Sequence, residues 1–167
     1  GYIDDATSTV FARFYEYEGV FPALDSFQSF IQEKGVPVSV YMDRHSTYKT
    51  SRQTTIEEDL EGAESNTQFQ QVMKSIGVKV IYARSPQAKG RVERLFETLQ
   101  DRLIKEMRLA GISSIHEANH FLETYLPSFN KKFSVSAKNK GTLYTKVSDD
   151  FDFKWTFSLR TKRTIGN

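Results

Sequence analysis

The chain of 167 residues carries 23 lysines and arginines against 21 aspartates and glutamates, a formal net charge of +2. So small a net charge neither indicates nor excludes a nucleic-acid-binding protein, and the distribution of the charges must decide. The absence of cysteine excludes a disulfide framework and any thiolate metal site. The sequence has no apolar run long enough to span a bilayer and no signal segment. We therefore expect a soluble, cytoplasmic protein with no membrane partner.

The amino-terminal part alternates strand and helix patterns. Alternating β-branched and aromatic residues predict a strand over residues 9–17, after a turn at residues 4–8 and an earlier strand. An amphipathic helix follows and ends before Gly35. Residues 36–43 then predict a strand that ends in the carboxylate of Asp43.

The middle of the chain leads to a long helix. Residues 50–66 are polar and acidic and predict a solvated loop, while residues 67–76 predict a helix ended by Gly77 and residues 78–83 a short strand. A long helix should follow and end near Gly111, because apolar residues recur every three or four positions at Val92, Phe96, Leu99, Leu103 and Met107.

The last third predicts a helix, a linker and a strand. Ser114 and Glu117 form a capping box for a helix that reaches Phe133. Residues 134–150 predict a polar linker, and strict alternation over 151–159 predicts a strand. We expect a core domain at 1–133 and the beginning of a C-terminal β-rich domain at 151–167, within a longer protein. Strands alternating with helices predict an α/β fold with a mixed sheet.

One acid stands among basic residues where the strand pattern gives way to the long helix. Glu93 is surrounded in sequence by Lys89, Arg91 and Arg94. One hypothesis is a cap, in which Glu93 complements the helix dipole and pairs with Arg91 or Arg94. The other is a metal site with Asp43, because Mg²⁺ prefers carboxylates together with substrate phosphates, and nearby cations hold a nucleic-acid backbone.

A resemblance favours the metal site. The segment "SPQAKGRVE", residues 85–93, is similar to the P-Q-x-x-G-x-V-E motif of retroviral integrases. The longer segment 85–112 resembles the integrase-type catalytic core of bacterial insertion-sequence transposases of the ISNCY group, as do "IDDATS" (3–8) and "NKKFSV" (130–135). This resemblance implies an RNase H-like three-layer fold with a central mixed β-sheet flanked by helices. It also implies a DDE transposase of the bacterial cytoplasm that uses two Mg²⁺ (or Mn²⁺) ions to cut transposon ends and join them to target DNA, acting as a homo-oligomer on DNA.

The resemblance assigns two acids. Asp43 corresponds to the second acid and Glu93 to the third, both as catalytic residues and metal ligands. The first acid is expected upstream of Gly1, because one strand too few separates Asp4 from Asp43. Asp4 is the fallback, and without the upstream acid this chain alone is expected to be inactive.

The resemblance also suggests DNA contacts. Lys89, Arg91 and Arg94 are the candidate nucleic-acid-binding residues, and Gly90 is expected to form a tight turn before Glu93. Two interpretations are open for the basic residues further along the helix, Arg102, Lys105 and Arg108. They either extend this DNA-binding surface or lie on a solvated helix face with ion pairs at helical spacing. Two other functions stay open: a non-catalytic DNA-binding remnant, and an RNase H-like nuclease.

Overall fold

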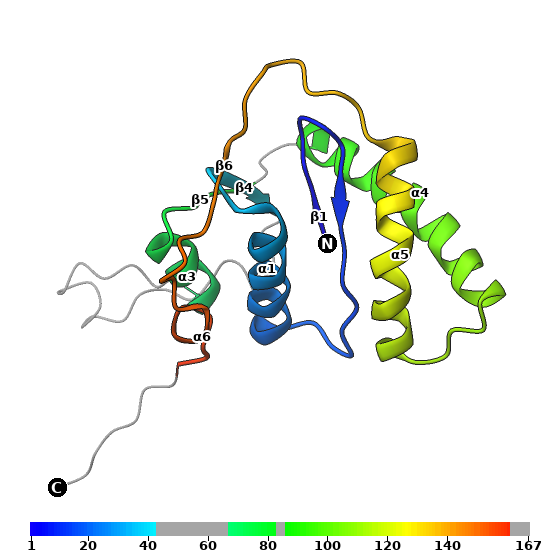
Figure 1. Cartoon of the computed structure of the whole chain (residues 1–167), viewed down its shortest axis with the longest axis horizontal. Helices are drawn as coiled ribbons and strands as arrows, with labels where there is room; N and C mark the ends of the chain where they lie inside the picture. The colour runs from blue at the N-terminus through cyan, green and yellow to red at the C-terminus, as the bar shows by residue number, and fades with distance from the viewer. Residues whose placement is uncertain (43–66, 83–85, 161–167) are drawn as a thin grey trace, which may run out of the picture. The chain divides into compact units, whose positions relative to one another are not determined.

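A computed structural model describes residues 1–42, 67–82 and 86–160 (Figure 1). The strands are β1 (Tyr2–Ile3), β2 (Val10–Phe11), β3 (Val36–Pro37), β4 (Ser39–Met42), β5 (Lys79–Tyr82) and β6 (Tyr144–Thr145). The helices are α1 (Val20–Lys34), α3 (Gln68–Ser75), α4 (Pro86–Leu109), α5 (Ile115–Phe133) and α6 (Phe153–Thr156). The predicted acidic loop at 50–66 lies outside the described residues.

The described strands pair two by two. β1 pairs with β2 and β3 with β6, both antiparallel, and β4 pairs with β5 in parallel. Both senses of pairing that a mixed sheet requires are therefore present, as three two-stranded sheets. The single central sheet of an RNase H-like fold stays a prediction. Among the described helices, none combines the length and the apolar content needed to cross a membrane.

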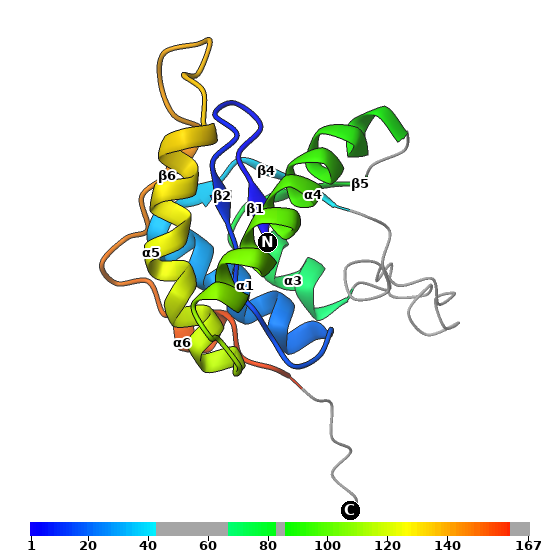
Figure 2. The ribbon, with the colours of Figure 1, turned by 90° about the vertical axis from the view of Figure 1, so that its right-hand side faces the viewer.

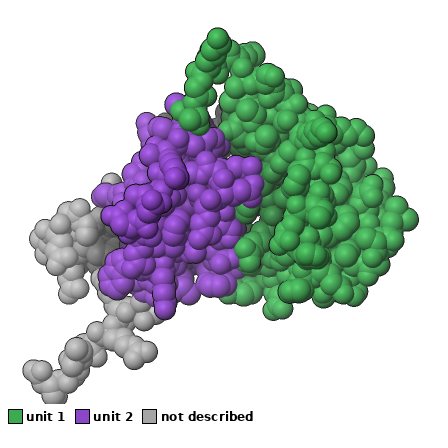
Figure 3. Space-filling view, in the orientation of Figure 1, with its two compact units in different colours: residues 1–18, 83–142 green, residues 19–82, 143–167 purple. Residues whose placement is uncertain are grey.

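The chain divides into two compact units (Figure 3). Unit 1 contains residues 1–18 and 83–142, and unit 2 contains residues 19–82 and 143–167. Unit 2 thus includes the end of the predicted linker, where β6 forms, and the residues assigned to a C-terminal module. That module stays a prediction.

Unit 1 is built from the β1–β2 hairpin and helices α4 and α5, with the hairpin running alongside α5 in both views (Figures 1 and 2). The predicted turn at residues 4–8 is confirmed, because the Asp4 carboxylate accepts hydrogen bonds from the Thr7 amide and hydroxyl, both at 2.7 Å. The buried core combines strand and helix residues, namely Val10, Leu99, Leu103, Leu122, Leu126 and Phe129.

The strand predicted over residues 9–17 is wrong beyond Phe11. Only Val10–Phe11 pairs with another strand. Further along, the amide and carbonyl of Phe14 bond to the side chain of Asn119 on α5, at 2.8 and 3.0 Å. The backbone groups that a strand partner would satisfy are satisfied by a helix side chain instead.

The two helices of unit 1 follow their predicted patterns at most positions. α4 ends just before Gly111, whose φ of 69° is a left-handed conformation that favours glycine. α5 begins with the predicted capping box of Ser114 and Glu117. Ile115, in the first turn of α5, is 37% exposed.

Unit 2 has its core between α1 and α3. α1 ends at Gly35, whose φ is 92°, and α3 begins with a capping box of Thr67 and Gln70. The ring of Phe27 meets that of Phe69 edge to face, with centroids 5.9 Å apart. The most deeply buried side chains come from both helices: Leu24, Phe27, Ile31, Phe69 and Met73.

The strand predicted at 36–43 changes partner at Val38. The Val38 amide donates to the Leu143 carbonyl at 3.2 Å, next to β6, whereas its carbonyl accepts from the Lys79 amide at 3.0 Å, at the start of β5. One extended segment therefore forms two short strands.

The strand predicted at 151–159 is wrong. Residues Phe153–Thr156 form the short helix α6, in which the Asp152 carboxylate accepts from the Trp155 amide at 2.8 Å. Of the alternating residues, Phe157 is buried but Trp155 is 68% exposed. With no neighbouring strand in the described residues, local capping satisfies the backbone instead.

Candidate active site

Helix α4 carries the predicted third acid. Leu99 and Leu103 of the predicted stripe are both 4% exposed and pack in the core of unit 1, with Phe96 and Met107 half-buried beside them. Glu93 is three residues before Phe96 but off the stripe, and its side chain is exposed. The carboxylate is therefore accessible to a ligand.

The predicted position of Glu93 at the helix start is wrong. α4 already begins at Pro86, so Glu93 is its eighth residue. Pro86 suits a first turn because its missing N–H would have no partner there. The helix dipole acts mainly within the first turn, and the unpaired amides belong to the first four residues. A helix cap consequently does not explain Glu93.

Gly90 lies inside α4 and does not form the predicted turn. It is absent from the described glycines with positive φ, which are Gly35, Gly77, Gly111 and Gly141. A methyl group at Gly90 would lie 3.7 Å from Arg94 Nη1, an ordinary van der Waals contact. The guanidinium of Arg94 thus lies close to Gly90, one turn towards the helix start.

Glu93 and Arg94 do not pair with each other. Both side chains are exposed, and neither forms an ion pair with any side chain that the structure describes. The proposed pair of Glu93 with Arg91 cannot be assigned, because only the backbone of Arg91 and of Lys89 is described, within α4. Within the described part of the chain, the carboxylate of Glu93 and the guanidinium of Arg94 are therefore both exposed on α4 without an ion-pair partner.

Asp43, the predicted second acid, lies outside the described residues. The residue before it, Met42, ends β4 and is in register with Tyr82, the last residue of β5. Asp43 therefore follows the carboxyl end of a parallel strand pair in the sequence. In open α/β sheets this edge is where ligands bind.

Asp4, the fallback for the first acid, closes the β1–β2 turn through its two hydrogen bonds to Thr7. This is the turn-forming behaviour predicted for it. Asp5 is exposed in the same turn. Neither observation favours Asp4 as a metal ligand over an acid upstream of Gly1.

The exposed carboxylate of Glu93 is compatible with a magnesium site. Among residues 1–42, 67–82 and 86–160, no group of three acids, histidines or cysteines is placed to hold a metal. Glu93 nevertheless offers two exposed carboxylate oxygens, the hard donors that Mg²⁺ prefers. The fit thus rests on one described acid and on the position of Asp43 in the sequence.

The basic residues further along α4 are mostly engaged elsewhere. Lys105 forms an ion pair with Asp101 one turn earlier, and this pair lowers the pKa of Asp101. The guanidinium of Arg102 lies over the ring of Phe133, 5.0 Å from its centroid. For Lys105 the structure supports the solvated face with an ion pair at helical spacing, whereas Arg102 contacts an aromatic ring.

Sequence reasoning missed two asparagines of α5 that hold the hairpin segment. Asn119 and Asn130 bond the backbones of Phe14 and Val10, respectively, each with both its oxygen and its nitrogen. They are eleven positions apart, which places them on one face of a helix with 3.6 residues per turn. That spacing, beside buried Ala118 and Phe129, was the available signal.

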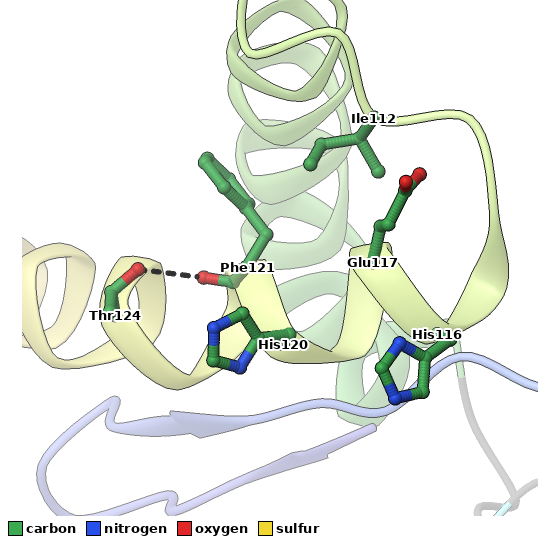
Figure 4. A pocket seen from close by; sticks show the side chains of 6 residues that line it. All are labelled: Ile112, His116, Glu117, His120, Phe121 and Thr124. Carbon is green, nitrogen blue, oxygen red and sulfur yellow. Dashed lines mark hydrogen bonds between the residues drawn. The ribbon is translucent and has the colours of Figure 1, made fainter.

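A surface hollow at the start of α5 is separate from the candidate acids. It is lined by Ile112, His116, Glu117, His120, Phe121 and Thr124 (Figure 4). The Glu117 carboxylate accepts from the amides of Ser113 and Ser114 at 2.9 and 3.0 Å, and these bonds lower its pKa. Its acid is therefore used in capping.

Comparison with known proteins gives two relatives. The chain is 34% identical over 148 residues to "Putative transposase y4bF" of Sinorhizobium fredii, which covers 88% of this chain and 31% of the relative. It is 32% identical over 139 residues to "Transposase for insertion sequence IS1202" of Streptococcus pneumoniae, covering 81% of this chain and 29% of the relative. The chain is therefore similar to transposases over most of its length.

The chain spans about a third of the length of these relatives. No protein-family model matches it, and no solved structure matches it. The similarity thus supports the prediction of a transposase. The three-acid DDE mechanism stays a prediction.

Proposed function

We propose that this chain is part of the catalytic core of a DDE-type DNA transposase, with Asp43 and Glu93 as two of the three acids. The observation that carries the proposal is the similarity to two proteins named transposases, over 88% and 81% of the chain. The exposure of Glu93 beside Arg94 supports the assignment of the site, because an acid that binds metal and phosphate must be accessible.

An RNase H-like arrangement is part of the proposal. The parallel pair β4–β5 ends at Met42 and Tyr82, and Asp43 follows Met42 directly. A strand-end acid of this kind suits a ligand site at the carboxyl edge of a sheet. The first acid would lie upstream of Gly1, since Asp4 serves the hairpin turn.

The chemistry is phosphoryl transfer on DNA. In cleavage, the oxygen of water attacks phosphorus and the 3′ oxygen at the transposon end leaves as a hydroxyl. In joining, that 3′ hydroxyl loses its proton and attacks phosphorus of a target phosphodiester, and the target's own 3′ oxygen leaves and takes up a proton. Two Mg²⁺ or Mn²⁺ ions, when bound, would stabilise the charge on the attacking and leaving oxygens. Asp43 and Glu93 would supply carboxylate oxygens to hold them.

The basic residues have a distinct task in this proposal. Lys89, Arg91 and Arg94 would hold the DNA backbone near carboxylates that otherwise repel phosphate. The DNA partners would be transposon ends and target DNA, bridged by two or more copies of the protein.

The test uses the full reading frame that encodes this chain, with Glu93→Gln and Asp43→Asn variants. Each substitution keeps the size of the side chain and removes a metal-binding charge. We expect Mg²⁺-dependent cleavage and joining of a DNA substrate to fall by about 10²- to 10³-fold or more, since metal stabilisation is worth several kcal/mol. DNA binding without metal should persist. Glu106→Gln, an exposed acid later on α4, is the matched control.

The other functions give different results. Cleavage without joining would identify an RNase H-like nuclease. Salt-dependent DNA binding with no metal-dependent chemistry would identify a binding remnant. Full activity of the Glu93→Gln variant would contradict the site assignment.

A further inference from the structure

The positive charge of the chain is concentrated at the end of α5 and in the segment that follows. Residues 124–148 contain five lysines and no aspartate or glutamate. This segment therefore carries a formal charge of +5 in a chain whose net charge is +2, and the other residues together sum to −3. The asymmetry is not visible in the overall composition.

Four of these lysines lie in unit 1 with their side chains exposed, namely Lys131, Lys132, Lys138 and Lys140, which we call the lysine surface. None of them forms an ion pair with an acid in the described part of the chain. Figure 3 shows residues of the segment after α5 protruding at the top of unit 1. Four unpaired cations are thus presented outward from one end of this unit.

The base of the lysine surface is held by packing. The Phe133 ring packs on buried Phe129, with centroids 4.6 Å apart. The Lys132 ammonium lies 5.7 Å from the centroid of Phe133, on which Arg102 also lies. The Val135 amide donates to the Thr7 carbonyl at 2.8 Å, so the chain leaves α5 against the hairpin turn.

Helix capping accounts for only part of this charge. Lys131 and Lys132 lie in the last turn of α5, where cations complement the helix dipole. Lys138 and Lys140 lie beyond the helix, so the dipole does not explain them. The cluster therefore extends past the helix end, in a segment of sequence (124–148) that contains no acid.

We propose that the lysine surface is a contact for the phosphodiester backbone of duplex DNA, in addition to the residues at the start of α4; this rests on the proposed function. Exposed lysines act as point charges that bind phosphates without reading sequence. A membrane surface fits less well, because Val135 is the one large apolar side chain exposed within residues 129–142, while Leu126 and Phe129 are buried in the core. Contacts of this kind would position DNA along α5 and release counterions.

The test is the salt dependence of binding of the 167-residue chain to a fluorescent duplex of arbitrary sequence. The variant replaces Lys131, Lys132, Lys138 and Lys140 with glutamine. A matched control replaces four exposed lysines of unit 2, Lys74, Lys79, Lys146 and Lys154, with the same loss of charge. A third variant changes the lysine surface to arginine. Urea unfolding establishes that all variants fold.

We expect the slope of log K against log salt to fall by about 3 to 4 in the glutamine variant, since each phosphate contact contributes about 0.9. The affinity should fall at least tenfold, while the arginine variant and the unit 2 control stay close to the original chain. Equal losses of affinity and slope in the glutamine variant and the unit 2 control would show that only the net charge of the chain matters. That result would overturn the proposal.

Other outcomes separate the two proposals. If the chain binds DNA and the glutamine variant binds equally well, the lysine surface is wrong and the proposed function stands. If the original chain does not bind DNA, the lysine surface is wrong, and the cleavage and joining assay on the full reading frame decides the proposed function separately. If it binds anionic phosphatidylserine vesicles more tightly than DNA, and the glutamine variant loses this binding, the surface is a membrane contact instead.

Discussion

Asn130 and Val10, far apart in the sequence, form a reciprocal pair. The side-chain nitrogen of Asn130 donates to the Val10 carbonyl and its oxygen accepts from the Val10 amide, both at 2.8 Å. Val10 is 2% exposed, so water cannot replace these bonds. Next to this pair, the Val135 amide of "NKKFSV" donates to the Thr7 carbonyl of "IDDATS" at 2.8 Å, so these two segments also meet within unit 1.

Asn130→Ala should destabilise unit 1 strongly. It leaves one amide and one carbonyl of Val10 without partners, and each unsatisfied buried group costs about 1–3 kcal/mol. We expect a loss of about 2–4 kcal/mol in the free energy of unfolding, measured by urea denaturation. Asn119→Ala should cost less, because Phe14 is only half-buried.

Asn139→Ala is the matched control, since Asn139 is an exposed asparagine after α5. It should change the free energy of unfolding by less than about 0.5 kcal/mol. An Asn130→Ala variant as stable as this control would show that the reciprocal pair does not hold the hairpin.

Gly90→Ala should be neutral or stabilising. Alanine in a helix interior is favoured over glycine by about 0.5–1 kcal/mol, and among the described atoms the added methyl group meets only Arg94 Nη1, at 3.7 Å. Gly111→Ala should cost about 1 kcal/mol, because its φ is 69° and no atom lies within 4 Å to explain another effect. Urea unfolding of both variants measures the difference, and a destabilising Gly90→Ala would support the turn predicted from the sequence.

Helices were predictable where local signals and burial agree. The predicted capping box at Ser114 and the glycine after α1 mark helix ends that the structure confirms. These signals are local, because a capping side chain accepts hydrogen bonds from the unpaired backbone amides of the first helical turn.

Strands were less predictable, because their partners are remote. Alternation over 151–159 matches a strand, yet Asp152 caps a helical turn there. Around Phe14 the partner is Asn119, more than one hundred residues away. At the candidate site, the motif located Glu93 on α4, but the start of the helix at Pro86 was missed because the glycine at 90 suggested a turn.

The capping box of α5 should make stability depend on pH. Hydrogen bonds from the Ser113 and Ser114 amides lower the pKa of Glu117 below its usual value of 4.5. A lowered pKa in the folded state contributes stability above the unfolded pKa, which is lost as the pH falls through the folded pKa. Tm should therefore fall on acidification from about pH 6 to about pH 3, and Glu117→Gln should reduce this fall.

Glutamine is the informative substitution at Glu117 because it keeps an oxygen that accepts from the amides. Tm near neutral pH should fall modestly, because the neutral amide accepts weaker hydrogen bonds than the carboxylate, and the two Tm values should converge near about pH 3. Glu106→Gln is the control, since the described structure shows no hydrogen bond to Glu106. Equal pH profiles for the original chain and the Glu117→Gln variant would contradict the capping contribution.

Arg94 and Lys105 should differ in their effect on DNA binding, although both are exposed cations of α4. Lys105 is paired with Asp101, so its charge is already offset, whereas Arg94 has no described acidic partner and lies near Gly90 in the motif segment. If this end of α4 holds DNA, Arg94→Gln should lower the salt slope of binding by about 0.9. Lys105→Gln should change it by much less, because the substitution also frees Asp101. Fluorescence anisotropy over a salt series measures both, and equal slopes for the two variants would place the DNA contact away from the Glu93 end of the helix.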